Sequence, residues 1–222
     1  MILEFRKVSG KSKGFSLKDV SFAVEKGYLV GVTGKNGAGK STLLHYIMNA
    51  DSKYEGEILL NGTNIRNHYD MVRNMVGYVA DENAFFKAHT AKENADLLSV
   101  FYEKWDEELF LQVMKKMEVP LWEKLENLSR GEFLKFQMAF AMAHDAKLYL
   151  IDEATGGMDP IFRKEFFRLL HGILEQEDTS ILMVTHIEDE IEMQMDYAAI
   201  MEKGQIISFG EVGLNDEPDK RV

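Results

Sequence analysis

Short apolar strands alternate with amphipathic helices along the chain. Residues 2–8 and 16–24 carry apolar side chains at every second position, which predicts two strands with one buried face each. Continuous apolar runs at 28–33, 147–151 and 180–184 predict strands that are buried on both faces. Such runs are typical of the central strands of a sheet that helices cover on both sides.

Helical patterns fill most of the intervals between these strands. Residues 41–49 and 161–175 are predicted to be helical, and another helix is expected to start near Glu188. The segment 85–144 is rich in Met, Phe, Leu and Lys and is also predicted to be helical. Alternating strands and helices indicate a mainly parallel sheet, and the long helical block is expected to form its own lobe.

Turn residues predict two hairpins. Residues 57–60 lead into the turn Asn61-Gly62, and residues 198–201 and 205–209 form the arms of a final hairpin. Residues 76–79 add one more short strand. Antiparallel pairs are therefore expected beside the parallel sheet.

The segment with the most specific chemistry follows the first doubly buried strand. Its spacing, Gly34-x-x-x-x-Gly39-Lys40-Ser41, satisfies the Walker A pattern between a strand and a helix. Glycines let the backbone curl so that N–H groups point at phosphate oxygens, and the following helix presents its positive end to them. Lys40 supplies a charge for the β- and γ-phosphates, and Ser41 offers a hydroxyl ligand to Mg²⁺. The candidate phosphate-binding residues are Gly34, Lys35, Asn36, Gly37, Ala38, Gly39, Lys40, Ser41 and Thr42.

A later buried strand ends in two carboxylates. Asp152 and Glu153 follow the apolar run 148–151, which delivers them to the carboxyl edge of the sheet beside the phosphate loop. There Asp152 is expected to bind Mg²⁺ directly or through water, and Glu153 to orient and deprotonate the attacking water. A pair of helix-capping carboxylates is the alternative, and the phosphate loop earlier in the chain favours the catalytic interpretation.

Composition excludes several other classes of protein. The 222 residues are 45% hydrophobic, which is enough for one large α/β domain with a sizeable core. The net charge of -11 argues against a protein that coats nucleic acid, and the absence of cysteine excludes disulfides and thiolate metal sites. The longest apolar runs are too short to span a bilayer, so work at a membrane would require a partner that holds the chain there.

Further segments, in order, make the chain resemble the ATP-binding-cassette (ABC) ATPases over residues 2–210. They are Gly77–Asp81, similar to the strand that leads into the Q-loop; His89–Asn94, similar to the T-x-x-E-N segment of transporter subunits; Leu128–Glu132, similar to the LSGGQ signature; Glu153–Pro160, similar to the stretch from the catalytic glutamate to the D-loop; and Thr185-His186, similar to the H-loop. Many NTPase families share a phosphate loop, whereas this ordered set is far more specific.

The resemblance implies an α/β fold of the P-loop NTPase type, with a mainly parallel sheet, an antiparallel β subdomain and an inserted α-helical lobe. Residues 1–222 would form a single ABC ATPase domain. Within it, residues 1–84 and 145–222 would make the core with its β subdomain, and residues 85–144 the helical lobe that carries the signature. Two copies would bind ATP between them, head to tail.

The resemblance also assigns residues to the shared site. Ser129 and Gly131 would contact the γ-phosphate of ATP held by the other copy, and Asp159 would act across the interface. His186 would donate a hydrogen bond to the γ-phosphate and help to fix the attacking water. Asp159 equally suits the cap of a helix that begins at Pro160, and both roles are compatible.

Three positions depart from the pattern of the family. Asp81, followed by Glu82, stands where glutamine is usual, and either carboxylate could bind Mg²⁺ or its water. Arg130 replaces one glycine of the signature, so it either lies outside the nucleotide gap or adds positive charge to it. Phe15 is the candidate for stacking on adenine, but it suits the buried face of a strand equally well.

The function that the resemblance implies is ATP binding and hydrolysis in the nucleotide-binding subunit of an ABC transporter, most similar to export-type subunits with a separate permease. The expected cofactors are ATP and Mg²⁺. The expected partners are an integral-membrane permease, docked near residues 85–94, and a second ATPase subunit that is identical or closely related. Nucleic acid is not expected as a partner. The chain would lie in the cytoplasm, held at the inner face of the cell membrane by the permease.

Two alternatives are weaker. A soluble ABC ATPase that acts on nucleic acid or ribosomes would carry long coiled coils, or two cassettes with a basic linker, and the sequence has neither. A phosphate-loop kinase of another family would not explain Leu128–Glu132 together with His186. The transported substrate, the direction of transport and the pairing of the ATPase subunits are left open.

Overall fold

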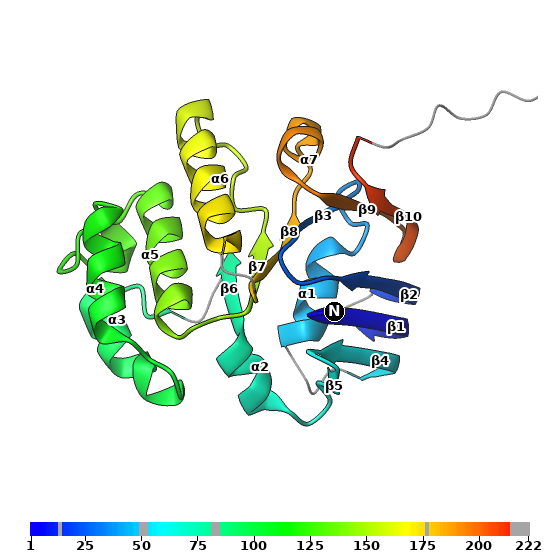
Figure 1. The fold of residues 1–222 in the computed structure, drawn as a ribbon, viewed down its shortest axis with the longest axis horizontal. Helices are drawn as coiled ribbons and strands as arrows, with labels where there is room; N and C mark the ends of the chain where they lie inside the picture. The colour runs from blue at the N-terminus through cyan, green and yellow to red at the C-terminus, as the bar shows by residue number, and fades with distance from the viewer. Residues whose placement is uncertain (13–14, 49–52, 81–84, 176–177, 214–222) are drawn as a thin grey trace, which may run out of the picture.

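The strands of the computed structural model form two sheets, the first of them antiparallel (Figure 1). The structure describes residues 1–12, 15–48, 53–80, 85–175 and 178–213. The antiparallel sheet has the strand order β2-β1-β4-β5. Its strands are β1 (Leu3–Ser12), β2 (Phe15–Val24), β4 (Tyr54–Leu60) and β5 (Thr63–Asn64).

The second sheet has six strands in the order β10-β9-β3-β8-β7-β6. All neighbours in it run parallel except β9 and β10, which form the predicted final hairpin. Its strands are β3 (Leu29–Thr33), β6 (Val76–Ala80), β7 (Leu148–Asp152), β8 (Ser180–Val184), β9 (Tyr197–Glu202) and β10 (Gln205–Glu211). The fold class expected from the sequence, a mainly parallel sheet with an antiparallel addition, is confirmed.

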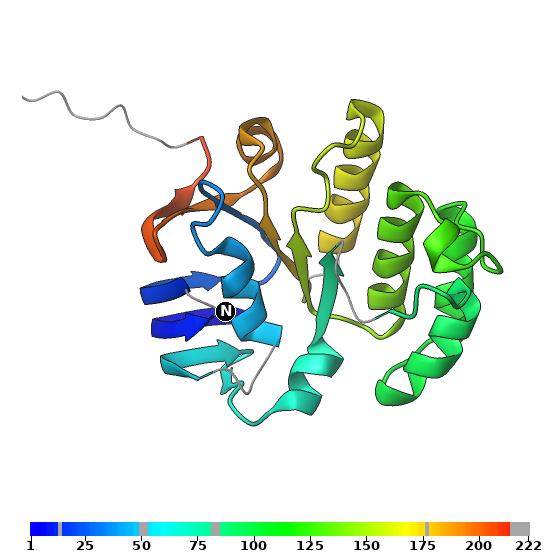
Figure 2. The same ribbon diagram turned by 180° about the vertical axis from the view of Figure 1, so that it is seen from behind.

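The helices divide between the two ends of the molecule and the middle (Figure 1). Helices α3, α4 and α5 gather at one end, and the antiparallel sheet lies at the other with β9 and β10 above it. The other strands of the six-stranded sheet lie between them, as Figure 2 shows from behind. The α-helices are α1 (Lys40–Met48), α2 (Tyr69–Met75), α3 (Ala91–Leu98), α4 (Glu107–Lys116), α5 (Arg130–Ala143), α6 (Pro160–Leu174) and α7 (Glu188–Gln194), and short 3₁₀ helices occupy Ser99–Phe101 and Leu125–Asn127. None of the helices in the described part of the chain has the length and apolar character needed to cross a membrane.

The central strands bury both faces, as their apolar sequences predict. Along β7, Leu148 and Leu150 join a core that also contains α1 and the antiparallel sheet. The alternate residues Tyr149 and Ile151 join a second core with α5 and α6. Because successive side chains of a strand point to opposite faces, one strand anchors both layers of helices.

A third core lies among residues 85–143 and is built on aromatic side chains. The phenylalanines of α5 pack inside it: Phe136 and Phe140 are buried, and Phe133 packs partly buried against them. Met114 and Met138 are also buried. Helix α5 begins at Arg130 because Ser129 caps it.

We expect stability to depend on pH through His144, at the carboxyl end of α5. The imidazole is buried and stacks on Tyr102 with 4.3 Å between ring centroids. Burial lowers the pKa of His144 from 6.5 to about 4. Between pH 6.5 and about pH 4, His144 becomes protonated in the unfolded chain but stays neutral in the folded chain. The free energy of unfolding therefore decreases as the pH falls through this range.

The free energy of unfolding should therefore decrease by up to about 3 kcal/mol between pH 6.5 and pH 4 through this group. Urea denaturation across that range measures it, and His144→Gln should flatten the slope. The matched control His171→Gln, at an exposed histidine of α6, should keep the parental slope. A His144→Gln variant with the parental slope would contradict the assignment.

Candidate active site

The phosphate loop connects β3 to α1 and requires glycine where it passes β9. Gly34 has φ +149°, and a Cβ atom there would lie 2.1 Å from the carbonyl oxygen of Met201. Gly39 has φ +108° immediately before α1 begins at Lys40. The loop is closed by a hydrogen bond of 3.0 Å from the Ala38 N–H to the Lys35 carbonyl. The backbone is thus curled as the motif predicts.

A cavity of about 320 Å³ opens over this loop. It is lined by Asn36, Gly37, Gly39, Lys40, Ser41, Thr42 and Glu153. Six residues of the predicted phosphate loop and the predicted catalytic glutamate, separated by more than a hundred positions in the chain, therefore face one space.

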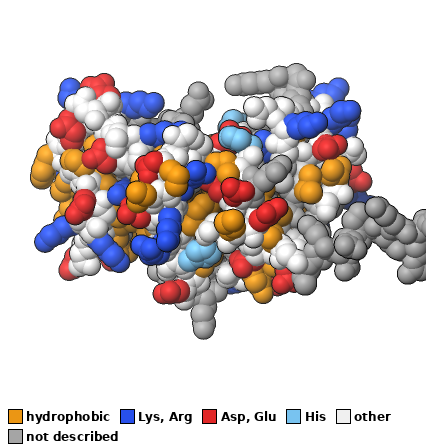
Figure 3. Space-filling model, turned by 90° about the horizontal axis from the view of Figure 1, so that it is seen from above, with side chains coloured by type: hydrophobic (Ala, Val, Ile, Leu, Met, Phe, Trp, Pro, Cys, Tyr) orange, Lys and Arg blue, Asp and Glu red, His pale blue; other side chains and the backbone are white. Residues whose placement is uncertain are grey.

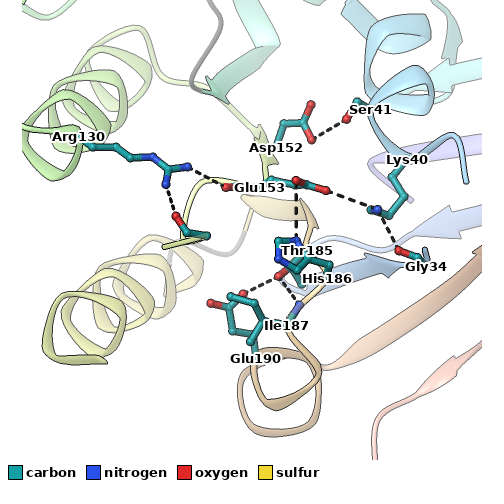
Figure 4. A network of polar contacts seen from close by, with 11 residues as sticks. Gly34, Lys40, Ser41, Arg130, Asp152, Glu153, Thr185, His186, Ile187 and Glu190 are labelled. Carbon is teal, nitrogen blue, oxygen red and sulfur yellow. Dashed lines mark hydrogen bonds and ion pairs between the residues drawn. The ribbon is translucent and has the colours of Figure 1, made fainter. Parts of the chain in front are cut away.

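Lys40 is a buried cation with two partners in this cavity. Its side chain is 4% exposed. The ammonium donates a hydrogen bond of 3.0 Å to the Gly34 carbonyl and lies 3.5 Å from Oε1 of Glu153 (Figure 4). Because a buried charge is costly unless it is paired, these contacts hold the ammonium inside the loop before any ligand arrives.

Asp152 ends β7 and faces α1. The hydroxyl of Ser41 donates a hydrogen bond of 3.0 Å to Oδ1 of Asp152. Burial raises the pKa of Asp152, and the neighbouring carboxylate of Glu153 adds to this effect, while the Ser41 hydrogen bond opposes it. A carboxylate and a hydroxyl held this close form the oxygen-rich ligand set that hard divalent cations prefer.

Glu153 lies between two cationic or ionisable groups in a constrained backbone position. Its φ is +47°, which is unusual for a residue with a side chain. Its N–H donates a hydrogen bond of 3.0 Å to the Val184 carbonyl. Oε1 faces Lys40, and Oε2 lies 3.8 Å from Nδ1 of His186 (Figure 4). The end of β8 therefore holds the backbone N–H of Glu153 in place.

The residue before His186 is held by a buried carboxylate that sequence reasoning missed. The Thr185 hydroxyl donates a hydrogen bond of 2.7 Å to Oε2 of Glu190 and accepts one of 3.1 Å from the Ile187 N–H. Glu190 is 4% exposed, although it lies in the short helix α7. No spacing rule indicates a pair between a strand end and the next helix, so the sequence carries no clear signal for it.

Ser129 and Gly131 do not line the cavity of their own subunit. Ser129 caps α5: its hydroxyl accepts a hydrogen bond of 3.2 Å from the Glu132 N–H and donates one of 2.7 Å to the Glu132 carboxylate. The hydrogen bonds that the hydroxyl and the N–H of Ser129 donate to the Glu132 carboxylate lower the pKa of Glu132. The sequence S-x-x-E at residues 129–132 is typical of such a capping pair.

Arg130 turns back onto its own subunit. Its guanidinium donates hydrogen bonds to the carbonyl oxygens of Gly156 and Glu153, the latter at 3.3 Å (Figure 4). Arg130 thus lies against the backbone that follows β7, and its place relative to the nucleotide gap stays a prediction. Sequence reasoning missed this contact because it joins two segments that are distant in the chain.

Asp159 caps α6, as one of its two predicted roles requires. Its Oδ1 accepts hydrogen bonds of 3.0 and 2.9 Å from the N–H groups of Ile161 and Phe162, and Pro160 takes the first helical position. Its role between subunits stays a prediction.

The beginning of β2 lies beside the phosphate loop. The Lys18 N–H donates to the Gly204 carbonyl at 2.8 Å, and the Gly204 N–H donates to the Ala38 carbonyl at 2.9 Å. A groove of about 930 Å³ runs along this part of the antiparallel sheet and includes Lys11 and Lys18 in its lining. The predicted contacts of Phe15, Asp81 and Glu82 lie outside what the structure describes.

Comparison with known proteins places this site in a family. Residues 17–156 match the family of ABC transporters. The ABC transporter ATP-binding protein YtrB of Bacillus subtilis is 32% identical over 208 residues, which cover 92% of this chain and 70% of that protein. The chain spans between 62% and 70% of the length of the curated relatives it matches.

Solved structures share the fold. An ATP-binding subunit of an ABC transporter is 25% identical, with a TM-score of 0.83, and the match covers 95% of this chain and 90% of that one. The ATP-binding cassette MJ0796, solved as a dimer in a post-hydrolysis state bound to ADP and Pi, is 22% identical with a TM-score of 0.82 and coverage of 95% and 98%.

The chain belongs to the ABC transporter ATP-binding proteins. It is an ATP-binding and ATP-hydrolysing subunit of this transporter class, and the alternative of a soluble ABC ATPase that acts on nucleic acid or ribosomes is not supported.

Replacing Asp152 should raise the stability of the nucleotide-free protein and weaken its binding of Mg²⁺–ATP. Since burial raises the pKa of Asp152, its charge destabilises the folded chain at neutral pH, and this penalty disappears as the pH falls below the ordinary aspartate range. Asp152→Asn should raise the melting temperature of the nucleotide-free protein by about 2–4 °C, the shift that corresponds to roughly 1 kcal/mol in a chain of this size.

We expect Mg²⁺ and ATP to raise the melting temperature of the parent protein further, and the same variant should lose this further rise. Differential scanning calorimetry with and without Mg²⁺–ATP measures both effects. Asp189→Asn, at an exposed aspartate of α7, is the matched control and should change neither. A lowered melting temperature in the nucleotide-free Asp152→Asn protein would refute the electrostatic argument.

Proposed function

We propose that this chain binds Mg²⁺–ATP in the cavity over the phosphate loop and that hydrolysis there drives a separate membrane permease. One observation carries the proposal. A buried ammonium and a hydroxyl from α1 converge within hydrogen-bond or ion-pair distance of two adjacent carboxylates at the end of β7, and three of these four groups, those of Lys40, Ser41 and Glu153, line one cavity. This arrangement supplies a phosphate cradle, a cation site and a base.

The phosphate end of the site follows from the loop and its lysine. The N–H groups at the start of α1 and the ammonium of Lys40 attract the β- and γ-phosphates. Ser41 and Asp152 are the residues that would hold Mg²⁺, because both offer oxygen and already lie in contact. The cation supplies neutralisation of the phosphate charge when it is bound. Asp81 or Glu82 would add a further ligand or bind its water.

Glu153 is the proposed general base. Its carboxylate lines the cavity and lies between Lys40 and His186, so it can accept the proton of a water molecule aligned with the γ-phosphate. His186 is half-exposed, which leaves its ring free to donate to that phosphate and to hold the water in line. Glu153 carries the proton until it is released with the products, and neither side chain forms a covalent bond to phosphorus.

A second copy would complete the site. Ser129, Asp159 and the neighbouring helix ends are exposed in the single chain, and neither residue lines its own cavity. Ser129 and Gly131 open α5, so their end of the helix favours an anion such as the γ-phosphate of the other copy's ATP. The cassette MJ0796, which shares this fold, was solved as a dimer, and this supports the pairing of two copies.

Adenine would lie where the antiparallel sheet meets the phosphate loop. The two hydrogen bonds that join β2, Gly204 and Ala38 bring this groove next to the loop, which supports Phe15 at the start of β2 as the stacking residue.

The hydrophobic clusters support a division of the chain into a core, residues 1–84 and 145–222, and a helical lobe, residues 85–144. The aromatic cluster of the lobe is made of residues from the lobe itself.

The permease would dock on the helical lobe and hold the chain at the inner face of the cell membrane. Large apolar side chains are exposed there, namely Phe86, Leu97, Val100, Phe101 and Trp122. Hydrophobic side chains are also visible toward this end of the face drawn in Figure 3, among mixed charges. Exposed apolar residues of this size favour a protein partner.

Glu153→Gln tests the catalytic assignment. Without a base, ATP hydrolysis should slow by roughly a hundredfold or more, which is the scale of general-base loss. The variant should also accumulate as an ATP-bound dimer in light scattering, because binding is kept while turnover is lost. Glu165→Gln, at an exposed glutamate of α6, should behave like the parent. A Glu153→Gln protein that stays monomeric with saturating ATP would count against the head-to-tail site.

Phe86→Asp tests the docking surface. Phe86 is 47% exposed and lies within the segment expected to meet the permease. The charge should prevent co-purification with the integral-membrane partner from detergent extracts of the native membrane, and leave the ATPase rate of the isolated chain unchanged. Ile207→Asp, at a 57% exposed position of β10, is the control and should still co-purify. Equal recovery of the membrane partner with both variants would rule out this surface.

A further inference from the structure

Arg130 occupies an unfavourable electrostatic position unless something compensates it. It is the first residue of α5, directly after the capping Ser129. A cation at this end of a helix faces the positive end of the helix dipole. The guanidinium instead reaches the carbonyl oxygens of Glu153 and Gly156, and its planar set of donors suits two acceptors that lie in different peptide units.

The backbone that receives Arg130 is weakly held by its own bonds. Glu153 has φ +47° and Gly157 has φ +73°. Within this turn, the Gly156 N–H bonds to the Glu153 carbonyl at 3.4 Å, and the Met158 N–H bonds to the Thr155 carbonyl at 3.2 Å. These distances are at the long end for backbone hydrogen bonds, as is the 3.3 Å of the bond from Arg130 to the Glu153 carbonyl, so the two bonds from Arg130 add to the constraint on a loosely held turn.

A second contact fastens the same two segments. A Cβ atom on Gly131 would lie 2.7 Å from the ring of Phe162, so only glycine lets the first turn of α5 approach the first turn of α6 this closely. Arg130 thus contacts the start of the segment 153–162, and Gly131 its end. The signature turn and the catalytic turn of one subunit are joined at both places.

We propose that Arg130 is a positioning residue: through the Glu153 and Gly156 carbonyls it holds Glu153 in the orientation that hydrolysis needs, and so ties the catalytic turn to the signature turn of the same subunit. This inference rests on the proposed role of Glu153. Since Arg130 is exposed, its bonds contribute little to folding stability, and its loss changes the rate more than the melting temperature.

Arg130→Ala in the full chain tests the proposal by steady-state ATPase kinetics. The expected result is a kcat lowered about tenfold with a KM for ATP within about twofold, because a slightly misplaced catalytic group loses rate while ground-state binding persists. Arg130→Lys keeps one cation but not the fork and should give an intermediate rate. Arg168→Ala, at an exposed arginine of α6, is the matched control and should match the parent.

The decisive comparison repeats Arg130→Ala in the Glu153→Gln background, with slow turnover followed as ADP formed in a single-turnover reaction. If Arg130 acts through Glu153, the second substitution changes the residual rate by less than about twofold. An equal loss in both backgrounds overturns the proposal, and so does a raised KM at constant kcat, which would place Arg130 on the partner's nucleotide. Should Arg130→Ala fail to fold, Arg130→Gln carries the same comparison.

The single variants separate this inference from the proposed function. A Glu153→Gln protein with the parental rate refutes the role of Glu153, whatever Arg130 does. If Glu153→Gln is slow and Arg130→Ala hydrolyses ATP at the parental rate, only the positioning role of Arg130 is refuted.

Discussion

The register of three parallel strands determines where the chemistry of this protein takes place. Val32 of β3 and Asp152 of β7 both pair with Val184 of β8, so the three strands end at the same level of the sheet. The phosphate loop, the two carboxylates and the histidine turn follow directly from these ends. A shift of one residue in β7 would turn Asp152 to the opposite face and separate it from Ser41.

The site that this register assembles is electrostatically demanding. Lys40 is buried, Asp152 is largely buried with its pKa raised, and Glu153 is adjacent to both. One ammonium faces two carboxylates, so a negative excess stays beside the cavity until a divalent cation arrives. The charges of Lys40, Asp152 and Glu153 therefore destabilise the β7–α1 interface relative to an apolar one. Charged groups at such a cost are typical of functional sites, which supports a role in binding Mg²⁺–ATP.

Much of the fold was predictable, because continuous apolar runs and glycine-rich turns reflect local physics. The strands of the six-stranded sheet, the final hairpin and the helix after the phosphate loop all lie close to their expected residues. The contacts of Arg130 and Glu190 were not predictable, since each depends on segments that meet only in the folded chain. The capping of α5 by Ser129 was readable from S-x-x-E, yet it competed with a functional interpretation of the same residues.

The close packing of Gly131 on Phe162 makes these two positions a steric pair. A larger residue at position 131 fits only if the aromatic ring at position 162 is replaced by something smaller, so each restricts the substitutions that the other tolerates during evolution. Gly131 lies in the first turn of α5 and Phe162 in the first turn of α6, so a substitution at either helix end is limited by the residue at the other. The distance between the two helix ends is therefore expected to change only through paired substitutions.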